Sequence, residues 1–307
     1  MSIETEKEKE TIETHNLNIW AFNINSWRKK INIINNILEQ NNVDILFLTE
    51  TKISPFHEKD ITVLEGYSII FNSNINTYRH GTAFIYKTKL KLQVLEKHLP
   101  YIPQTRICRA DLKNYKIIKA TQTYTLEKDI KTAHKEEGRI ISVICEVNEK
   151  KIVLVGTYVP NSGSDYKNPF KRLAYRTLYW DIDIYNYLKN LEKIYTNIIW
   201  LGDLNVARLD NDMYKKNLNM PSCSAEERTN FQNFLNNSKW SDTFHDLNPT
   251  LWNIEDRCTF GVDIKCKLRI DYILVSLNLK AYVKRAQVEQ SVKGSDHCPV
   301  SCLLSFT

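Results

Sequence analysis

Glycine is scarce in this chain, and features that mark several other protein classes are missing. The 307 residues include only eight glycines, whereas ordinary usage of roughly 7% would give about twenty. We therefore expect the remaining glycines to mark positions where the backbone geometry requires them. Disordered, collagen-like and low-complexity architectures are excluded, because 42% of the residues are hydrophobic and 25% are charged, as in a globular protein.

Signals for membranes, secretion and zinc are also missing. No apolar run approaches the roughly 20 residues that a bilayer requires. Residues 1–15 carry five glutamates and two lysines without an apolar segment, so we expect a disordered acidic tail and not a secretory or transit peptide. The seven cysteines are odd in number and lack zinc-ribbon spacing, which favours reduced thiols in an intracellular protein.

The charge and the organisation of the chain allow two further expectations. The net charge is +6, and the acidic tail makes the remainder more basic still. A basic domain raises the expectation of a polyanion such as nucleic acid, although many basic proteins bind none. We expect a single domain over residues 16–307, because no Pro-, Gly- or Ser-rich linker and no repeat divides it. Residues about 90–134 show a weak, polar pattern that predicts a surface insertion.

Apolar periodicity predicts two halves that are each a sheet edged by helices. Strands are expected at 17–23, 44–48, 66–72, 82–87, 140–146, 151–158, 197–201, 269–276 and 299–305, with a turn at 148–150. Helices are expected at 28–40, at about 170–195, and from a capping box at Ser224 and Glu227 to Phe234.

Polar residues gather where these strands end, and loops beyond strand ends often carry function. The residues concerned are Asn23, Asn25, Glu50, Asp203, Asn205, Asp271, Asp296 and His297. Singly, each is more often a turn former than a functional residue. Together, their oxygens are the hard ligands that suit Mg²⁺, and no Cys/His cluster suggests zinc.

Asp271 is unusual because it lies between Ile270 and Tyr272 in an apolar strand. A buried unpaired carboxylate is costly, so Asp271 requires a partner, and His297 is the available imidazole. An Asp that orients a His is a recurring catalytic device. A purely structural Asp–His pair remains the alternative.

Six motifs then occur in order along the chain. They are Asn23-Ile24-Asn25, Leu48-Thr49-Glu50-Thr51-Lys52, Tyr158-Val159-Pro160-Asn161-Ser162-Gly163, Gly202-Asp203-Leu204-Asn205-Val206-Ala207, Arg269-Ile270-Asp271-Tyr272 and Gly294-Ser295-Asp296-His297-Cys298-Pro299. This series resembles the endonuclease/exonuclease/phosphatase superfamily, and within it the exonuclease III type of apurinic/apyrimidinic (AP) endonuclease. Residues 136–141, 172–176 and 226–228 favour this branch over the phosphatase, sphingomyelinase and deadenylase branches.

The resemblance implies an α/β (α+β) fold of the DNase I type, a four-layered sandwich of two mixed β-sheets flanked by helices. It also implies a Mg²⁺ ion, with Mn²⁺ as a substitute, held principally by Glu50 with Asn25 and Asp296 close by. Asp203, Asn205 and His297 are further candidate metal ligands. Asn25 replaces an acidic residue of many eukaryotic relatives, although the bacterial type also has Asn.

The remaining site residues follow from the same resemblance. Asp203 would align or deprotonate the attacking water, and Asn205 would help to hold it. His297, oriented by Asp271, would contact the scissile phosphate. Tyr158, Asn23 and Asn161 would surround the same phosphate.

DNA contacts are expected from basic residues in or beside the motifs, namely Arg28, Lys52, Arg139, Arg172 and Arg176. For Arg172 and Arg176 a merely solvated helix face is an equal alternative. A pocket for a flipped-out abasic sugar would comprise Phe260, Leu268 and Ile270, with Leu268 in place of a common Trp. The stretch 260–268 is shorter than in typical relatives, and the 90–134 insertion has no counterpart.

The resemblance implies a DNA repair nuclease that cuts duplex DNA 5′ to abasic sites, with possible 3′–5′ exonuclease or 3′-phosphodiesterase activity. Two alternatives remain open, a retroelement-like endonuclease that nicks intact DNA and a non-catalytic DNA-binding module. We expect a monomer without membrane association, in the nucleus of a eukaryote, or otherwise in the cytoplasm, a viral factory or a virion.

Overall fold

Two mixed β-sheets form the centre of the molecule. The computed structural model describes residues 15–75, 78–100, 134–163, 169–214, 220–261 and 267–306. Within these ranges each sheet has six strands, in the orders β11-β12-β1-β2-β4-β3 and β5-β6-β7-β8-β10-β9. The first sheet contains β1 (His15–Asn23), β2 (Ile45–Thr49), β3 (Tyr67–Asn72), β4 (Thr82–Lys87), β11 (Val283–Val288) and β12 (Val300–Phe306). The second contains β5 (Gln93–Glu96), β6 (Ile140–Val147), β7 (Lys150–Tyr158), β8 (Ile198–Asp203), β9 (Trp240–Asp242) and β10 (Asp271–Ser276).

Each sheet has one parallel pair near its centre. β1 pairs with β2 and β7 pairs with β8 in parallel, whereas the other described pairs are antiparallel. The registers place Asn23 beside Thr49 at the end of one pair and Tyr158 beside Asp203 at the end of the other. Because parallel strands end on the same side, the polar residues after them gather at one edge.

Helices lie on the outer faces and at the edges of the two sheets. They are α1 (Ile31–Gln40), α4 (Pro169–Tyr175), α5 (Asp181–Glu192), α6 (Ala225–Asn236), α7 (Thr243–Leu247), α8 (Ile254–Arg257) and α9 (Leu277–Lys280). Short 3₁₀ turns occupy Pro55–Asp60, Thr88–Leu90 and Asp210–Asp212. A π-helical turn, Arg176–Trp180, joins α4 to α5. The helix predicted over about 170–195 is therefore three consecutive helical segments, and it ends at Glu192.

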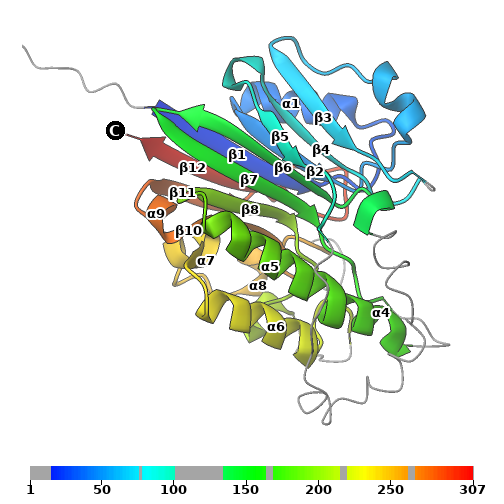
Figure 1. Cartoon of the computed structure of the whole chain (residues 1–307), viewed down its shortest axis with the longest axis vertical. Coiled ribbons are helices and arrows are strands. Elements are labelled where there is room, and N and C mark those ends of the chain that lie inside the picture. The colour runs from blue at the N-terminus through cyan, green and yellow to red at the C-terminus, as the bar shows by residue number, and fades with distance from the viewer. Residues whose placement is uncertain are drawn as a thin grey trace, which may run out of the picture.

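Three apolar clusters produce the layers. Leu17, Ile19 and Phe47 of the first sheet pack between the sheets against Leu154 and Leu201 of the second. The opposite face of the first sheet packs on Ile34, Ile37 and Leu38 of α1. The opposite face of the second sheet packs on residues of α5 and α6, including Ile184, Leu188 and Phe231. Figure 1 shows α5 and α6 outside the second sheet. The predicted four-layered sandwich is confirmed.

Local sequence signals account for several boundaries. Helix α1 begins at Ile31, three residues later than predicted, and Lys29 before it has a left-handed φ of +61°, which no helix continues. Asn148 and Glu149, at φ +47° and +60°, form the two-residue turn of the predicted β6–β7 hairpin. The Ser224–Glu227 capping box at the start of α6 is confirmed.

Other elements had no clear sequence signal. Strands β5 and β9 contain only four and three residues, too few for a periodic pattern, and β11 interrupts its apolar residues with Lys284 and Arg285. The predicted acidic tail, 1–15, lies outside the described residues apart from its last residue. The same is true of most of the predicted insertion. No helix in the described ranges is both long and apolar enough to cross a membrane.

A buried ionic network fixes the start of β10. The Arg269 guanidinium pairs with Asp212 at 2.8 Å and donates two hydrogen bonds to Asp242, at 3.1 and 2.6 Å. Arg257 pairs with Asp212 at 2.7 Å, and Arg208 with Asp242 at 3.2 Å. The network joins segments far apart in sequence and lies directly before Asp271, the first residue of β10.

We expect Asp242→Asn to lower the free energy of unfolding by about 3–5 kcal/mol at neutral pH, because a buried guanidinium loses a charged partner. Burial raises the pKa of Asp242, but Arg269 more than offsets this and holds it below the ordinary 3.8. The stability due to this ionisation is therefore complete above about pH 4 and is lost as the pH falls further. Urea unfolding across this pH range should show a shallower acid dependence in the variant.

The matched control is Asp210→Asn, since the Asp210 side chain is 53% exposed and pairs with Arg228 at the surface. It should change stability little. Equal losses in both variants would show that the network does not stabilise the fold.

Candidate active site

The Asn23 side chain lies between two acidic residues that come from different sheets. Asn23 ends β1, Glu50 follows β2 of the same sheet, and Asp203 ends β8 of the other sheet. Asn23 Nδ2 donates to Glu50 Oε1 at 3.0 Å and to Asp203 Oδ2 at 2.9 Å. Its Oδ1 accepts the backbone N–H of Asn25 at 3.0 Å. One amide therefore holds two carboxylates together across the sandwich.

Glu50 has three side-chain partners. Tyr158 donates its hydroxyl to Oε1 at 2.9 Å, beside the bond from Asn23, and Lys52 Nζ lies 2.8 Å from Oε2. Burial raises the pKa of Glu50, but the hydrogen bonds from Asn23, Lys52 and Tyr158 and the charge of Lys52 outweigh it and lower the pKa from 4.5 to about 2. Glu50 is thus an anion at neutral pH and available as a cation ligand.

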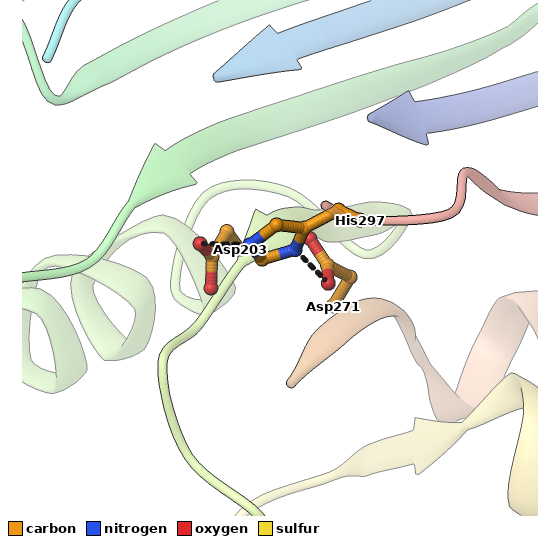
Figure 2. Close-up of side chains that lie close together, drawn as sticks. All are labelled: Asp203, Asp271 and His297. Atoms are coloured by element: carbon orange, nitrogen blue, oxygen red, sulfur yellow. Dashed lines mark hydrogen bonds and ion pairs between the residues drawn. The ribbon is translucent and has the colours of Figure 1, made fainter. Parts of the chain in front are cut away.

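His297 lies between Asp271 and Asp203, and all three side chains are buried (Figure 2). Its Nδ1 is 2.8 Å from Asp271 Oδ2, and its Nε2 is 4.0 Å from Asp203 Oδ2. Burial lowers the pKa of His297, but the negative charges of Asp271 and Asp203 raise it from 6.5 to about 10. The imidazole is therefore protonated at neutral pH. The predicted Asp271–His297 pair is present.

The pKa of Asp203 is shifted in the opposite direction to the pKa of Glu50. Burial and the charge of Asp271 raise its pKa from 3.8 to about 7, although His297 and Asn23 act against this. A carboxylate with such a pKa can accept a proton near neutral pH. The residue before Asp203 is Gly202, which allows β8 to pair closely with β7. A Cβ at this position would lie 2.1 Å from the Thr157 carbonyl oxygen.

Two asparagines fix the far side of Asp203. The backbone N–H of Asn205 donates to Asp203 Oδ1 at 2.9 Å, and its side chain donates to the Val159 carbonyl at 2.8 Å. Asn161 Nδ2 donates to Asn205 Oδ1 at 3.0 Å. Asn205 adopts a left-handed φ of +47°, which Asn tolerates better than most residues. The predicted Asn161 and Asn205 thus lie together beside Asp203.

Two further predicted metal ligands, Asn25 and Asp296, lie near Glu50. Asn25 Nδ2 donates to Asp296 Oδ1 at 3.0 Å, and Lys52 Nζ donates to Asn25 Oδ1 at 2.5 Å. The oxygens of Glu50, Asn25 and Asp296 therefore surround one small region. They are carboxylate and amide oxygens, which fit Mg²⁺ or Mn²⁺ better than zinc. Asp203, Asp271 and His297 also bring ligand atoms within 4.8 Å of one another, but there the Asp271 oxygen is engaged by the His297 ring.

An apolar wall adjoins this cluster. The Phe260 ring lies 4.9 Å from the His297 ring, and its backbone bridges to both Leu268 and His297. Leu268 and Ile270 are buried in a cluster with Met213 and Cys223. The three predicted pocket residues are thus brought together beside His297, while residues 262–266 of the shorter stretch lie outside the description.

Comparison with known proteins supports the arrangement. A model of the Endonuclease/Exonuclease/phosphatase family matches residues 17–297. The chain belongs to this family.

Similar proteins in the family act on nucleic acid according to their names. A DNA-(apurinic or apyrimidinic site) endonuclease of Dictyostelium discoideum is 28% identical over 305 residues, which cover 96% of this chain and 72% of that protein. Exodeoxyribonuclease III of Haemophilus influenzae is 26% identical over 302 residues, covering 91% and 97%. The crystal structure of the AP endonuclease LMAP from Leishmania major superposes with a TM-score of 0.76 and 24% identity, covering 95% of this chain and 89% of that one. The last shows the fold alone.

Two arginines predicted to contact DNA are internal in this member of the family. Arg176 is 2% exposed, and its guanidinium pairs with Asp181 at 2.6 Å and donates to the carbonyls of Pro160 and Leu204, both at 3.0 Å. The prediction for Arg176 is wrong, because its guanidinium is buried and already held by a carboxylate and two carbonyls, which leaves it out of reach of a DNA phosphate. It supports the loops that carry Asn161 and Asn205.

Arg139 is likewise turned inward, so its predicted DNA contact is also wrong. It is 3% exposed, pairs with Glu137, and donates to the Tyr158 carbonyl at 3.2 Å. Its guanidinium lies 4.9 Å from the centre of the Tyr158 ring and donates to His80 Nε2 at 3.0 Å. Burial and the Arg139 charge lower the pKa of His80 to about 3, so this imidazole is neutral. Arg139 therefore positions Tyr158 toward Glu50.

Arg28 and Arg172 are exposed, as DNA contacts require. Arg172 lies next to Gly163, where a Cβ would come 3.3 Å from its Cδ. Their contacts with DNA remain predictions.

Several supporting residues were not predicted from the sequence. Thr259 Oγ1 accepts the backbone N–H groups of Ile270 and Asp271, at 3.0 and 3.1 Å. Ser295 Oγ donates to the Asn23 carbonyl at 2.8 Å. His80 lies in a loop whose composition gave no reason to single it out. Ser295 alone could have been suspected, because it belongs to the Asp296–His297 motif.

We expect Arg176→Ala and Arg172→Ala to separate internal support of the fold from contact with DNA. Arg176→Ala should lower the free energy of unfolding by about 3–5 kcal/mol, because it leaves Asp181 buried without its cation. Arg172→Ala should leave stability nearly unchanged and reduce the slope of log affinity for DNA against log salt by about one. Urea unfolding and salt-dependent fluorescence anisotropy measure these effects. A stable Arg176→Ala protein with a reduced salt slope would restore the DNA-contact role.

Proposed function

We propose that this protein is a DNA repair nuclease that hydrolyses the phosphodiester bond 5′ to abasic sites in duplex DNA, leaving a 3′ hydroxyl and a 5′ deoxyribose phosphate. The observation that carries the proposal is the Asn23 amide that joins Glu50 and Asp203 beside the protonated His297. The names of the Dictyostelium and Haemophilus relatives support the same class of reaction.

Asp203 is the group suited to the attacking water. It is buried, and Asn23 and the Asn205 backbone fix one oxygen each. Its raised pKa makes it a proton acceptor near neutral pH. A water held by Asp203 and Asn205 would be oriented for attack on phosphorus, and this positioning is a large part of phosphodiester hydrolysis.

His297 supplies positive charge on the other side of the same carboxylate. A phosphodiester resists attack because its oxygens are anionic, and charge accumulates further in the transition state. The imidazolium, held by Asp271, can donate from Nε2 to a phosphoryl oxygen. The Asn161 amide and the Tyr158 hydroxyl lie on neighbouring parts of the same edge.

Glu50, Asn25 and Asp296 would hold Mg²⁺, with Mn²⁺ as a substitute. When bound, the ion supplies Lewis-acid stabilisation of the phosphate charge and of the leaving 3′ oxygen. The lowered pKa of Glu50 keeps its carboxylate ionised for this role. The oxygen-only donor set supports magnesium over zinc.

The substrate proposal is double-stranded DNA with an abasic site. The net charge of +6 and the exposed Arg28 and Arg172 favour a polyanion. The Phe260–Leu268–Ile270 wall next to His297 is apolar, as a niche for a sugar without its base requires. We further propose that the protein acts as an intracellular monomer, with 3′–5′ exonuclease or 3′-phosphodiesterase activity as a minor reaction.

An abasic-duplex nicking assay tests the reaction. We expect incision 5′ to the abasic site in Mg²⁺, and no incision in excess EDTA. Glu50→Ala and Asp203→Asn should each reduce kcat by at least about a hundredfold, because one removes an ionised ligand and the other the proton acceptor. Product ends are read by denaturing electrophoresis.

The intact duplex of the same sequence is the control. Equal cutting of intact and abasic duplex would replace the abasic-site proposal with the retroelement-like alternative. Salt-sensitive DNA binding without cutting would leave a binding module. Full activity in EDTA would contradict the metal-dependent mechanism.

Asp271→Asn should reduce kcat by about 10²–10⁴-fold with little change in KM, because the imidazolium loses the carboxylate that orients and stabilises it. Steady-state incision at several DNA concentrations separates the two constants. The comparable loss of a surface carboxylate in Asp246→Asn should leave both constants unchanged. A change confined to KM in Asp271→Asn would indicate a role in DNA binding alone.

A further inference from the structure

The structure places an ammonium group among the oxygens that suit a metal ion. Lys52 Nζ lies 2.8 Å from Glu50 Oε2 and donates to Asn25 Oδ1 at 2.5 Å. These are two of the three side chains whose oxygens would hold the metal. We propose that Lys52 competes with a divalent metal ion for Glu50 and Asn25, and that DNA phosphates relieve this competition by attracting the ammonium group. The inference rests on the metal site of the proposed function.

The position of Lys52 is fixed by its backbone. Its N–H donates to the His80 carbonyl at 2.9 Å, and the N–H of Thr51 donates to the Gly81 carbonyl at 3.1 Å. Lys52 adopts a left-handed φ of +52°, as Glu50 does, a conformation that non-glycine residues seldom adopt. The side chain is only 30% exposed. The loop backbone therefore directs the Lys52 side chain toward Glu50, and this contact is not a chance encounter of an exposed lysine.

A second lysine makes the region electrostatically balanced. Lys30 Nζ donates to the carbonyls of Ile24 and Asn25. The carboxylates of Asp296 and Glu50 are close enough to act electrostatically on this ammonium group, as is Lys52. Two ammonium groups thus face the two carboxylates, Glu50 and Asp296. A divalent ion on the same oxygens adds positive charge to a site that already has it, and the repulsion at such range is large.

DNA changes this balance. A phosphate beside the site adds negative charge and offers oxygens to a lysine ammonium, which is a flexible point donor. Movement of Lys52 from Glu50 to phosphate would free Glu50 Oε2 and Asn25 Oδ1 for the metal. Metal and DNA would then each strengthen the binding of the other, as linkage requires when they share one competitor.

The first experiment measures Mn²⁺ binding to the DNA-free protein by electron paramagnetic resonance of the unbound ion. Lys52→Met keeps an unbranched side chain as far as Cε and removes only the charged ammonium group. We expect it to bind Mn²⁺ about tenfold more tightly than the unmodified protein, within the usual range of couplings between two ligands. Lys52→Arg should bind Mn²⁺ like the unmodified protein, because it retains the charge.

Lys59→Met is the matched control, since Lys59 is exposed and lies over the Phe56 ring away from these ligands. It should leave Mn²⁺ affinity unchanged. Lys52→Gln provides a second neutral variant, and thermal unfolding identifies any variant that fails to fold. Mn²⁺ affinity that is equal or weaker in both neutral variants would overturn the competition, because a merely structural lysine would loosen Glu50 when removed.

The second experiment repeats the titration with a closed dumbbell duplex, which has no ends and no abasic site. The duplex should tighten Mn²⁺ binding to the unmodified protein and should do so less in Lys52→Met. An equal effect in both proteins would overturn the coupling through Lys52. Neither titration depends on cleavage, so a failure of the nuclease proposal in the nicking assay is distinguishable from a failure of this one.

Discussion

The Asn23 amide is the interaction on which the rest of the site depends. Its Nδ2 group has two hydrogens, and one points to Glu50 in the first sheet and the other to Asp203 in the second. Two carboxylates in one buried region repel each other, and a neutral donor between them satisfies both without adding charge. This bridge is possible only because the parallel pairs β1–β2 and β7–β8 end at the same edge when the sheets pack face to face. The fold and the chemistry are thus joined at one side chain.

Buried arginines complete the support from within the protein. Arg176 holds the carbonyls of Pro160 and Leu204, and Arg139 holds the Tyr158 carbonyl. Arg269, through its ion pair with Asp212, anchors the backbone that continues into Ile270 and Asp271. Each is paired with a buried or half-buried carboxylate, so its charge is balanced inside the molecule. The basic residues near this edge therefore divide into two kinds, those that hold the loops from inside and those, such as Arg28 and Arg172, that remain exposed.

The sequence was sufficient to predict the layers and the acidic and amide residues that the structure brings together, but not the direction of the arginines beside them. Asp271 could be paired with His297 because a carboxylate between Ile270 and Tyr272 has to be buried and needs a partner. Arg176 could not be assigned, since its partner Asp181 is five residues away, beyond the three or four that bring side chains together on an α-helix. The π-helical turn Arg176–Trp180 makes this spacing possible, and no periodicity revealed it. His80 was equally hidden, and Lys52 was expected as a DNA contact and not as a partner of Glu50, because these contacts come from loops with left-handed φ values.

The two carboxylates that share Asn23 are made chemically different by their surroundings. Glu50 receives further hydrogen bonds from Tyr158 and Lys52, and its pKa falls to about 2. Asp203 is fully enclosed near Asp271, and its pKa rises to about 7. One remains an anion suited to bind a cation, and the other can exchange a proton. Divergent pKa values of neighbouring groups are how a single fold assigns separate roles to the same residue type. Here that division follows from which sheet each carboxylate comes from, since the lysine belongs to the loop after β2 and the second aspartate to β10, the strand beside β8.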